Sequence, residues 1–177
     1  MATFTISDNH FGHTNIIKHC NRPFTSVNEM NEFMVQEWNS VVKPDDTVIH
    51  VGDFAFRCNY EKLTGYIKRL NGYKILVRGN HDESAAKMLR AGFDKVYNQF
   101  VYNLDNTRFV LFEHIPDFRI ENTYPYNYYV YGHTHNNAVL NKPVWAACAC
   151  VEIIGYKPVL VEDLVRGLED KQLGVIL

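Results

Sequence analysis

The stretch from Lys74 to Asp82, Lys-Ile-Leu-Val-Arg-Gly-Asn-His-Asp, places a short apolar run directly before a cluster of polar side chains. The run 74–77 has the aliphatic, β-branched composition typical of a buried strand. The four residues from Gly79 onward then bring an amide, an imidazole and a carboxylate within consecutive positions. The stretch therefore predicts a strand that presents reactive groups at its carboxyl end.

Four further predicted strands end in the same way. The polar groups that follow them are Asp8-Asn9-His10, Gly52-Asp53, His114 and Gly132-His133-Thr134-His135. In open α/β sheets the loops after parallel strands meet at one edge, and ligands bind there. We therefore expect these groups, which lie far apart in the sequence, to meet in one pocket.

Hydrophobic periodicity predicts the remaining elements. One helix is expected at 27–42, where a Ser26–Glu29 capping box precedes apolar residues on one face and Pro44 follows the end. Other helices are expected at 60–70, 84–90 and 161–169, and strands at 3–7, 47–51, 108–112, 128–131, 144–149 and 151–154. Alternation of strand and helix favours parallel pairs in the first half, whereas the strand-rich second half favours antiparallel pairs.

These elements predict an α/β fold of two packed sheets with helices outside them. The chain has 177 residues, of which 46% are hydrophobic and 21% charged, and this suits a single domain, 1–177, with its own core. No internal repeat and no Gly/Ser-rich or Pro-rich linker indicates a boundary within it.

Net charge, hydropathy and cysteine spacing indicate which substrates and which cellular location suit the chain. The net charge of −2 lacks the basic excess of proteins that hold long nucleic acids, so a small phosphorylated or nucleotide-like substrate is favoured and long nucleic acid is not. No apolar run approaches about 18 residues, so we expect no membrane association and a cytoplasmic location. The four cysteines show no CxxC or zinc-ribbon spacing, which predicts reduced, packed thiols.

The polar blocks have the composition of a metal centre. Aspartate, histidine and asparagine without thiolate form a mixed nitrogen and oxygen ligand set suited to divalent Mn, Fe, Zn, Co or Ni. The set offers about seven donors, more than one ion and its water need, so two ions are expected. Turn-forming or solvated loops are the alternative reading of such residues. That alternative predicts neither the order of the blocks nor their shared edge.

In this order the five blocks resemble the calcineurin-like metallophosphoesterase family. The resemblance spans 8–135, and Gly-Asn-His-Asp together with Gly-His-Thr-His is its most specific part. His114 departs from the family pattern because Ile115-Pro116 follows where a glycine is common. The resemblance implies a four-layer double β-sandwich, two mixed sheets flanked by helices.

The resemblance also implies residue roles. One metal ion would bind to Asp8, His10 and His135, the other to Asn80, His114 and His133, and Asp53 would bridge the two. The ions would be divalent, with manganese expected before iron, zinc, cobalt or nickel. His81 resembles the family's general acid, which protonates the leaving alkoxide. Asp82 would orient His81 or a metal ligand.

Three further side chains lie near the first two blocks in sequence. His13, Arg22 and Arg57 are candidate contacts of the scissile phosphate, which an arginine binds through a bidentate fork. A solvated or structurally paired side chain explains each of them equally well. His19 and His50 lie outside the blocks and are interpreted as a solvated helix residue and an ordinary strand residue.

We therefore expect a phosphodiesterase or phosphatase in which a water activated between two metal ions attacks phosphorus in line. Two alternatives stay open. One is a metallonuclease, against which the acidic balance argues, and the other is a metal-binding interaction scaffold with little catalysis. A scaffold has no need of His81, so the complete set of blocks favours the enzyme.

Overall fold

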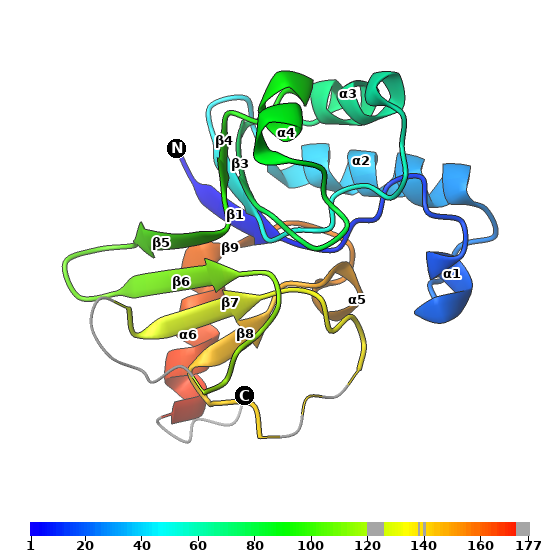
Figure 1. Cartoon of the computed structure of the whole chain (residues 1–177). Coiled ribbons are helices and arrows are strands. Elements are labelled where there is room, and N and C mark those ends of the chain that lie inside the picture. Colours follow the sequence, from blue (N-terminus) through cyan, green and yellow to red (C-terminus); the bar gives the residue numbers. More distant parts are fainter. Residues whose placement is uncertain (120–125, 138, 140, 173–177) are drawn as a thin grey trace.

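The computed structural model describes residues 1–119, 126–137, 139 and 141–172, which form two β-sheets with helices packed against them (Figure 1). The first sheet has the strand order β4 (Lys95–Tyr97), β3 (Tyr73–Val77), β2 (Thr47–His50), β1 (Thr3–Ile6) and β9 (Val159–Leu160). The four strands from β1 to β4 pair in parallel, as the first half of the sequence predicts, and β9 is antiparallel to β1.

The second sheet has the order β5 (Gln99–Asn103), β6 (Phe109–Glu113), β7 (Tyr128–Tyr131) and β8 (Ala146–Cys148). Its β5–β6 pair is antiparallel, whereas β6–β7 and β7–β8 are parallel. The expected antiparallel second half is therefore wrong. The connections 114–127 and 132–145 are long enough to return the chain to the starting end of the sheet, which a parallel pair requires.

Three helices cover the outer face of the first sheet: α2 (Val27–Val41), α3 (Tyr60–Arg69) and α4 (Ala85–Ala91) (Figure 1). The Ser26 side chain accepts a hydrogen bond from the Glu29 amide at 3.2 Å, which confirms the predicted start of α2. Alternate residues of each strand point to opposite faces of a sheet. Val48 accordingly belongs to the core under these helices, whereas its neighbour Ile49 belongs to the core between the sheets.

The core between the two sheets is aliphatic and aromatic. Ile49 and Val77 of the first sheet pack in one cluster with Phe112 and Val130 of the second. Helix α6 (Val161–Gln172) completes this cluster with three buried side chains, among them Val165. The two mixed sheets with their helices agree with the predicted fold class. Among the described residues, no helix is long and apolar enough to cross a membrane.

Some short elements differ from the prediction. The expected strand 151–154 is a helix, α5 (Val151–Ile154), and it ends at Gly155, whose left-handed φ of 76° stops the turn. Helix α1 (Ile16–His19) and strands β4, β5 and β9 were not predicted. A four-residue apolar run fits a strand and a buried helical turn equally well, because periodicity cannot separate them over such a length.

Candidate metal centre

The fold brings the polar blocks together at the carboxyl ends of five strands. Asp8 and His10 follow β1, Asp53 follows β2, Asn80 and His81 follow β3, His114 follows β6, and His133 and His135 follow β7. Their side chains form two neighbouring groups, which we call the first group (Asp8, His10, His135) and the second group (Asp53, His114, His133, with Asn80).

The first group is buried. Asp8 is fully buried and His10 is only 2% exposed. The Oδ1 atom of Asp8 lies 3.8 Å from Nε2 of His10 and 3.7 Å from Nε2 of His135. Three potential ligand atoms thus surround one point beneath the surface.

The second group lies beside it and reaches the surface. The Nε2 atom of His114 lies 3.4 Å from Oδ2 of Asp53 and 3.1 Å from Oδ1 of Asn80. Asn80 and His133 are exposed, whereas Asp53 and His114 are buried. This second point is therefore open to solvent on one side.

Asp53 connects the two groups. Its Oδ2 atom is 3.4 Å from Nε2 of His114 and also 3.5 Å from Nε2 of His10 in the first group. The carboxylate therefore stands where a ligand shared by two cations is needed.

Each of the two carboxylates uses its other oxygen to hold a neighbouring loop. The Oδ2 atom of Asp8 accepts a hydrogen bond from the His133 amide at 3.0 Å. The Oδ1 atom of Asp53 accepts one from the His81 amide at 2.9 Å. One oxygen of each carboxylate fixes the loops, and the other faces the imidazoles.

Two buried atoms of the first group test whether the residues fit a metal ion. Oδ1 of Asp8 and Nε2 of His10 are buried and have no hydrogen-bond partner among the described residues. Burying such polar atoms without a partner costs about 1–3 kcal/mol each. A divalent cation satisfies both at once, and nitrogen with carboxylate oxygen is a donor set that suits manganese, iron or zinc. The residues therefore fit the metal ions that the sequence predicts.

Hydrogen bonds at the far ring nitrogen orient two of the imidazoles. Nδ1 of His114 donates to the Val51 carbonyl oxygen at 2.8 Å, which leaves Nε2 to face Asp53. Nδ1 of His135 lies 3.0 Å from a carboxylate oxygen of Glu152. Metal-binding histidines are commonly oriented in this way, because the second bond fixes both tautomer and ring direction.

The backbone of these loops is strained where it carries the candidate ligands. Positive φ values occur at Asp8 (59°), His10 (52°), Asp53 (55°), His133 (68°) and His135 (49°). Non-glycine residues held in this region cost about 1–3 kcal/mol each and cluster at functional sites. The packed carboxyl edge of the sheets therefore stores strain at the groups that would bind metal.

Two glycines of the sequence blocks are required by close approach. A Cβ at Gly132 would lie 2.6 Å from Oδ2 of Asp8, and a Cβ at Gly79 would collide with the carboxylate of Asp53. The two carboxylates therefore need the space that glycine leaves.

The ionisable side chains of the site shift one another's pKa values. Burial opposes ionisation of Asp8, but the imidazoles of His10 and His114 outweigh it and hold the pKa of the carboxyl below its usual range. Burial likewise opposes the charge on His114, but its hydrogen bond to Asp53 raises its pKa to about 9. The acidic side is thus ionised and this imidazole is protonated at neutral pH, so a metal ion that binds there displaces a proton.

His81 and Asp82 hold different positions. The His81 side chain is 41% exposed, and its Nε2 atom is 4.0 Å from Oδ2 of Asp53, so it lies at the rim of the centre. Asp82 accepts hydrogen bonds from the amides of Asp53, Phe54 and Gly79 at 2.8 to 2.9 Å. Among the described contacts Asp82 therefore positions the loops that carry Asp53 and Asn80, not the His81 ring.

His13 and Arg57 lie beside the centre. The His13 ring stacks on Phe56 at 3.8 Å, and its Nδ1 atom is 3.4 Å from Nδ1 of His10. Arg57 is exposed, and its guanidinium carbon lies over the same Phe56 ring, 5.1 Å from the ring centre. Both remain candidate substrate contacts.

For Arg22 the structure favours the second of the two predicted interpretations, a structurally paired side chain. It is 4% exposed and donates hydrogen bonds to the carbonyl oxygens of Asp8 (2.7 Å) and Asn9 (2.9 Å). It also pairs with the Glu152 carboxylate at 2.7 Å. Its guanidinium is therefore occupied by protein groups beneath the centre and does not face a phosphate.

Glu152 is the residue that the sequence prediction missed. It lies in α5, its side chain is 4% exposed, and it contacts both His135 and Arg22. The signal available in the sequence was a single carboxylate within the apolar run 151–154. A charged side chain in such a run is buried only when it is paired.

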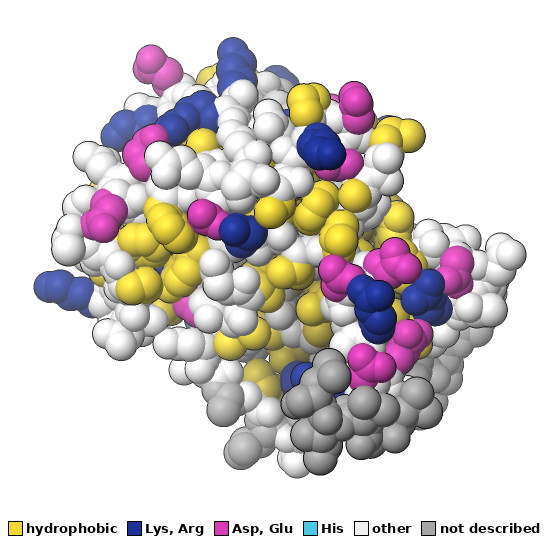
Figure 2. Space-filling view, turned by 180° about the vertical axis from the view of Figure 1, so that it is seen from behind, with side chains coloured by type: hydrophobic (Ala, Val, Ile, Leu, Met, Phe, Trp, Pro, Cys, Tyr) yellow, Lys and Arg dark blue, Asp and Glu magenta, His cyan; other side chains and the backbone are white. Residues whose placement is uncertain are grey.

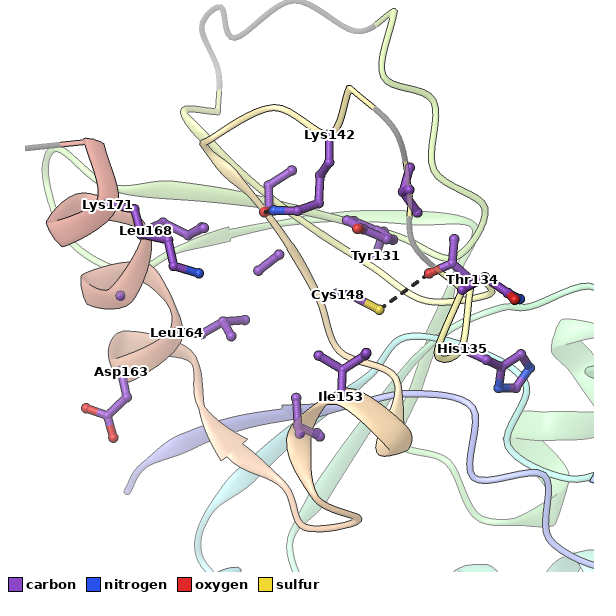
Figure 3. Close-up of a pocket in the computed structure, with 16 residues that line it drawn as sticks. Tyr131, Thr134, His135, Lys142, Cys148, Ile153, Asp163, Leu164, Leu168 and Lys171 are labelled. Carbon is purple, nitrogen blue, oxygen red and sulfur yellow. Dashed lines mark hydrogen bonds between the residues drawn. The ribbon is translucent and has the colours of Figure 1, made fainter. Parts of the chain in front are cut away.

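A separate cavity of about 440 Å³ lies between α6, α5 and β8 (Figure 3). Apolar side chains such as Ile153, Leu164 and Leu168 line much of it. His135 lies at its edge with the ring turned away from the cavity (Figure 3). Of the candidate ligands, His135 alone is among the described residues that line this cavity.

Comparison with known proteins supports the geometry. The family model of the calcineurin-like phosphoesterase superfamily domain matches residues 1–147. An uncharacterized protein of Methanocaldococcus jannaschii is 35% identical over 172 residues, covering 94% of this chain and 90% of its own length. The crystal structure of a protein of unknown function from Aquifex aeolicus matches with a TM-score of 0.75 and 28% identity over 93% of this chain and 98% of that one.

A more distant structure, that of a novel archaeal phosphodiesterase, matches with a TM-score of 0.44 and 18% identity over 85% of this chain and 82% of that one. The family match covers every candidate ligand from Asp8 to His135. It confirms the family that the five blocks predict. The chain belongs to the calcineurin-like phosphoesterase superfamily and is a metal-dependent phosphoric ester hydrolase.

Proposed function

We propose that the protein is a dinuclear enzyme that hydrolyses a phosphodiester or phosphomonoester of a small, nucleotide-like substrate. One observation carries this proposal: Oδ2 of Asp53 lies between Nε2 of His10 and Nε2 of His114, at 3.5 and 3.4 Å. These two imidazoles belong to different ligand groups. A single carboxylate oxygen that faces both groups is the arrangement that two adjacent cations require, because they repel each other without a shared anion.

The ligand groups divide the binding of the ions. Asp8, His10 and His135 would hold one ion, Asn80, His114 and His133 the other, and Asp53 both. Manganese is the first candidate for both positions because the ligands are oxygen and nitrogen without thiolate. When bound, two such ions polarise the phosphoryl oxygens and lower the pKa of a water.

His81 is the proposed proton donor to the leaving oxygen. Its ring lies at the open rim, edge-on to Phe56 with ring centres 5.0 Å apart, and its amide is fixed by Asp53. A donor in that place is close to the centre without being one of its ligands. An imidazole there protonates the alkoxide as the P–O bond breaks, which is typical of general acid catalysis.

The net charge of −2 supports a small substrate. Figure 2 shows the face turned away from the viewer in Figure 1, where Lys and Arg side chains are interspersed with Asp and Glu and with hydrophobic patches. A long nucleic acid is instead bound by a continuous basic stripe. All four cysteines are described and free of disulfides, which supports our proposal of a reducing, cytoplasmic setting.

A matched pair of variants tests the proposal. Hydrolysis of bis(4-nitrophenyl) phosphate and of 4-nitrophenyl phosphate is measured with added manganese, for the wild type, Asp53→Ala and the control Asp45→Ala, which changes an exposed aspartate. We expect Asp53→Ala to lower kcat/KM by more than about 100-fold, because even changes behind the ligands cost 10–100-fold. It should also lower the bound metal.

Unchanged hydrolysis in Asp53→Ala would contradict the proposal. A metal-loaded wild type that hydrolyses neither ester would favour the scaffold alternative. Cleavage of single-stranded or double-stranded nucleic acid in preference to both esters would favour the nuclease alternative.

A further inference from the structure

A second pocket, of about 380 Å³, lies beside the metal centre. It is formed by the loop after β1, the first turns of α2, the loop after β2 and the start of α3. The residues on which the inference rests are Thr14, Asn28, Phe56, Arg57 and Lys62. We call it the side pocket. None of the candidate metal ligands lines it.

Phe56 connects the side pocket with the surroundings of the metal centre. Its ring centre lies 3.8 Å from that of His13 and 5.0 Å from that of His81. The same residue lines the side pocket. The side pocket is therefore one side chain away from the rim of the metal centre.

The chemistry of the side pocket is that of an anion site. Arg57 and Lys62 supply two positive charges, and no carboxylate is among the described residues that line it. Neither cation forms an ion pair with a described residue within 4.0 Å. The side chains of Thr14 and Asn28 make no hydrogen bond to described residues and so retain their donors. Arginine and lysine with neutral donors and no acid are typical of phosphate binding.

Two helices add to the positive potential. Residues at or next to the N-terminal ends of α2, a helix of 15 residues, and α3, a helix of 10, line the side pocket. The N-terminus of a helix carries a partial positive charge that favours anions by about 0.3–1 kcal/mol. Charges, donors and helix ends therefore favour the same kind of ligand.

We propose that the side pocket binds a second phosphate group of the substrate, separate from the ester that is hydrolysed. The preferred substrate would then be a small phosphate ester with another phosphate some distance away, held by Arg57 and Lys62. This inference rests on the proposed function, because the scissile group is placed at the metal centre. It extends that function by assigning what lies at the other end of the substrate.

Non-hydrolysable probes test the inference by binding. Alkane bisphosphonates of increasing chain length are compared with alkyl monophosphonates of the same length, by isothermal titration calorimetry on the manganese-loaded protein. At the length that spans the two sites, the bisphosphonate should bind at least about tenfold tighter, because its second phosphonate can form charge-assisted hydrogen bonds in the side pocket. Shorter chains should lose this advantage because they cannot reach both sites.

Variants assign the advantage to the side pocket. Arg57→Gln and Lys62→Met should each reduce the preference for the bisphosphonate, and the double variant should abolish it. Lys68→Met, an exposed lysine of the same helix that does not line the side pocket, should keep it in full. Thermal unfolding of each variant checks that it is folded.

Equal affinity for the two probe types at every length would overturn the inference, and so would a preference that survives in the double variant. The outcome is separable from that of the proposed function. Calorimetry reports the second phosphate whether or not the protein turns over bis(4-nitrophenyl) phosphate, and turnover of that ester does not depend on a second phosphate.

Discussion

The first and second ligand groups differ in how the protein supports them. In the first group Asp8 and His10 are almost completely buried, and His135 is held from behind by Glu152. In the second group Asn80 and His133 are exposed. The protein thus encloses the first ligand group and leaves the second accessible.

This difference suggests a division of labour. A buried position with oriented ligands holds its ion tightly, because the ligands lose little freedom on binding. An exposed position has room for a substrate oxygen beside its protein ligands. Substitutions at the exposed rim, where His81 lies, should therefore change the rate of hydrolysis. Substitutions among the buried residues beneath the first group should change the free energy of unfolding.

The largest effect is expected at the rim. His81→Asn should lower kcat by about 10²–10⁴-fold, the usual contribution of a general acid. The loss should be greater for an alkyl ester than for a nitrophenyl ester, because nitrophenolate leaves without a proton. Steady-state kinetics with both esters and metal analysis measure this, and the metal content should not change.

The exposed His19 of α1 supplies the matched control, and His19→Asn should behave as the wild type. An equal loss of His81→Asn activity on both esters would remove His81 as the proton donor.

The next effect is expected at the buried ion pair of Arg22 and Glu152, and it concerns the free energy of unfolding. Arg22→Met removes the cationic partner of the buried Glu152 carboxylate and leaves it only the contact with His135, and breaking a buried pair costs about 3–5 kcal/mol. The control is Arg69→Met, whose pair with Glu32 has side chains 42% and 53% exposed. Exposed pairs contribute about 0–1 kcal/mol. Urea unfolding measures both free energies, and similar losses in the two variants would contradict the buried role.

A smaller effect separates the two groups directly. Glu152→Gln keeps a hydrogen-bond acceptor for His135 but removes the charge, and a change of this kind lowers metal affinity by about 10–100-fold. In a manganese titration against a chelator, the tighter step should weaken and the weaker step should stay unchanged. Glu32→Gln, at the exposed pair, serves as the control. If both steps shifted equally, Glu152 would not act through the first group alone.

The sequence predicted the candidate ligands at the strand ends better than the residues that hold them in place. The groups after β1, β2, β3, β6 and β7 were recognisable because each stands at the end of an apolar run. The relative direction of the strands in the second sheet was not recognisable. Whether β6 and β7 pair in parallel depends on the end of the sheet to which the connection between them leads. Sequence composition does not encode that path.

The roles of Arg22 and Glu152 were hidden for a related reason. They are 130 residues apart, and the bridge between Ser7 and Cys150 brings their segments together. Glu152 also lies beyond residue 147, where the family match ends. Left-handed φ values at five candidate ligands were equally hidden, because aspartate and histidine adopt them only when the surrounding structure enforces them.

The smallest effect is expected at His50, beneath the first group, and it concerns how the free energy of unfolding depends on pH. His50 is fully buried, and its Nε2 atom is 2.8 Å from Oδ1 of Asn9, between the ligands Asp8 and His10. Burial lowers the pKa of His50 to about 3 in the folded protein. In the unfolded chain the pKa is about 6.5, so below that pH the unfolded state binds the proton more readily than the folded state.

Folding should therefore lose about 1.4 kcal/mol per pH unit through His50 as the pH falls from about 6.5 toward 3, and lose nothing through it above 6.5. His50→Gln removes this contribution while keeping a donor for Asn9, so its free energy of unfolding should fall less steeply between pH 6.5 and 5 than that of the wild type. The exposed His19 serves again as the control, and His19→Gln should keep the wild-type slope. If the free energy of unfolding fell with pH at the same slope in all three proteins, the His50 imidazole would take up a proton in the folded state. Its burial would then not keep it neutral.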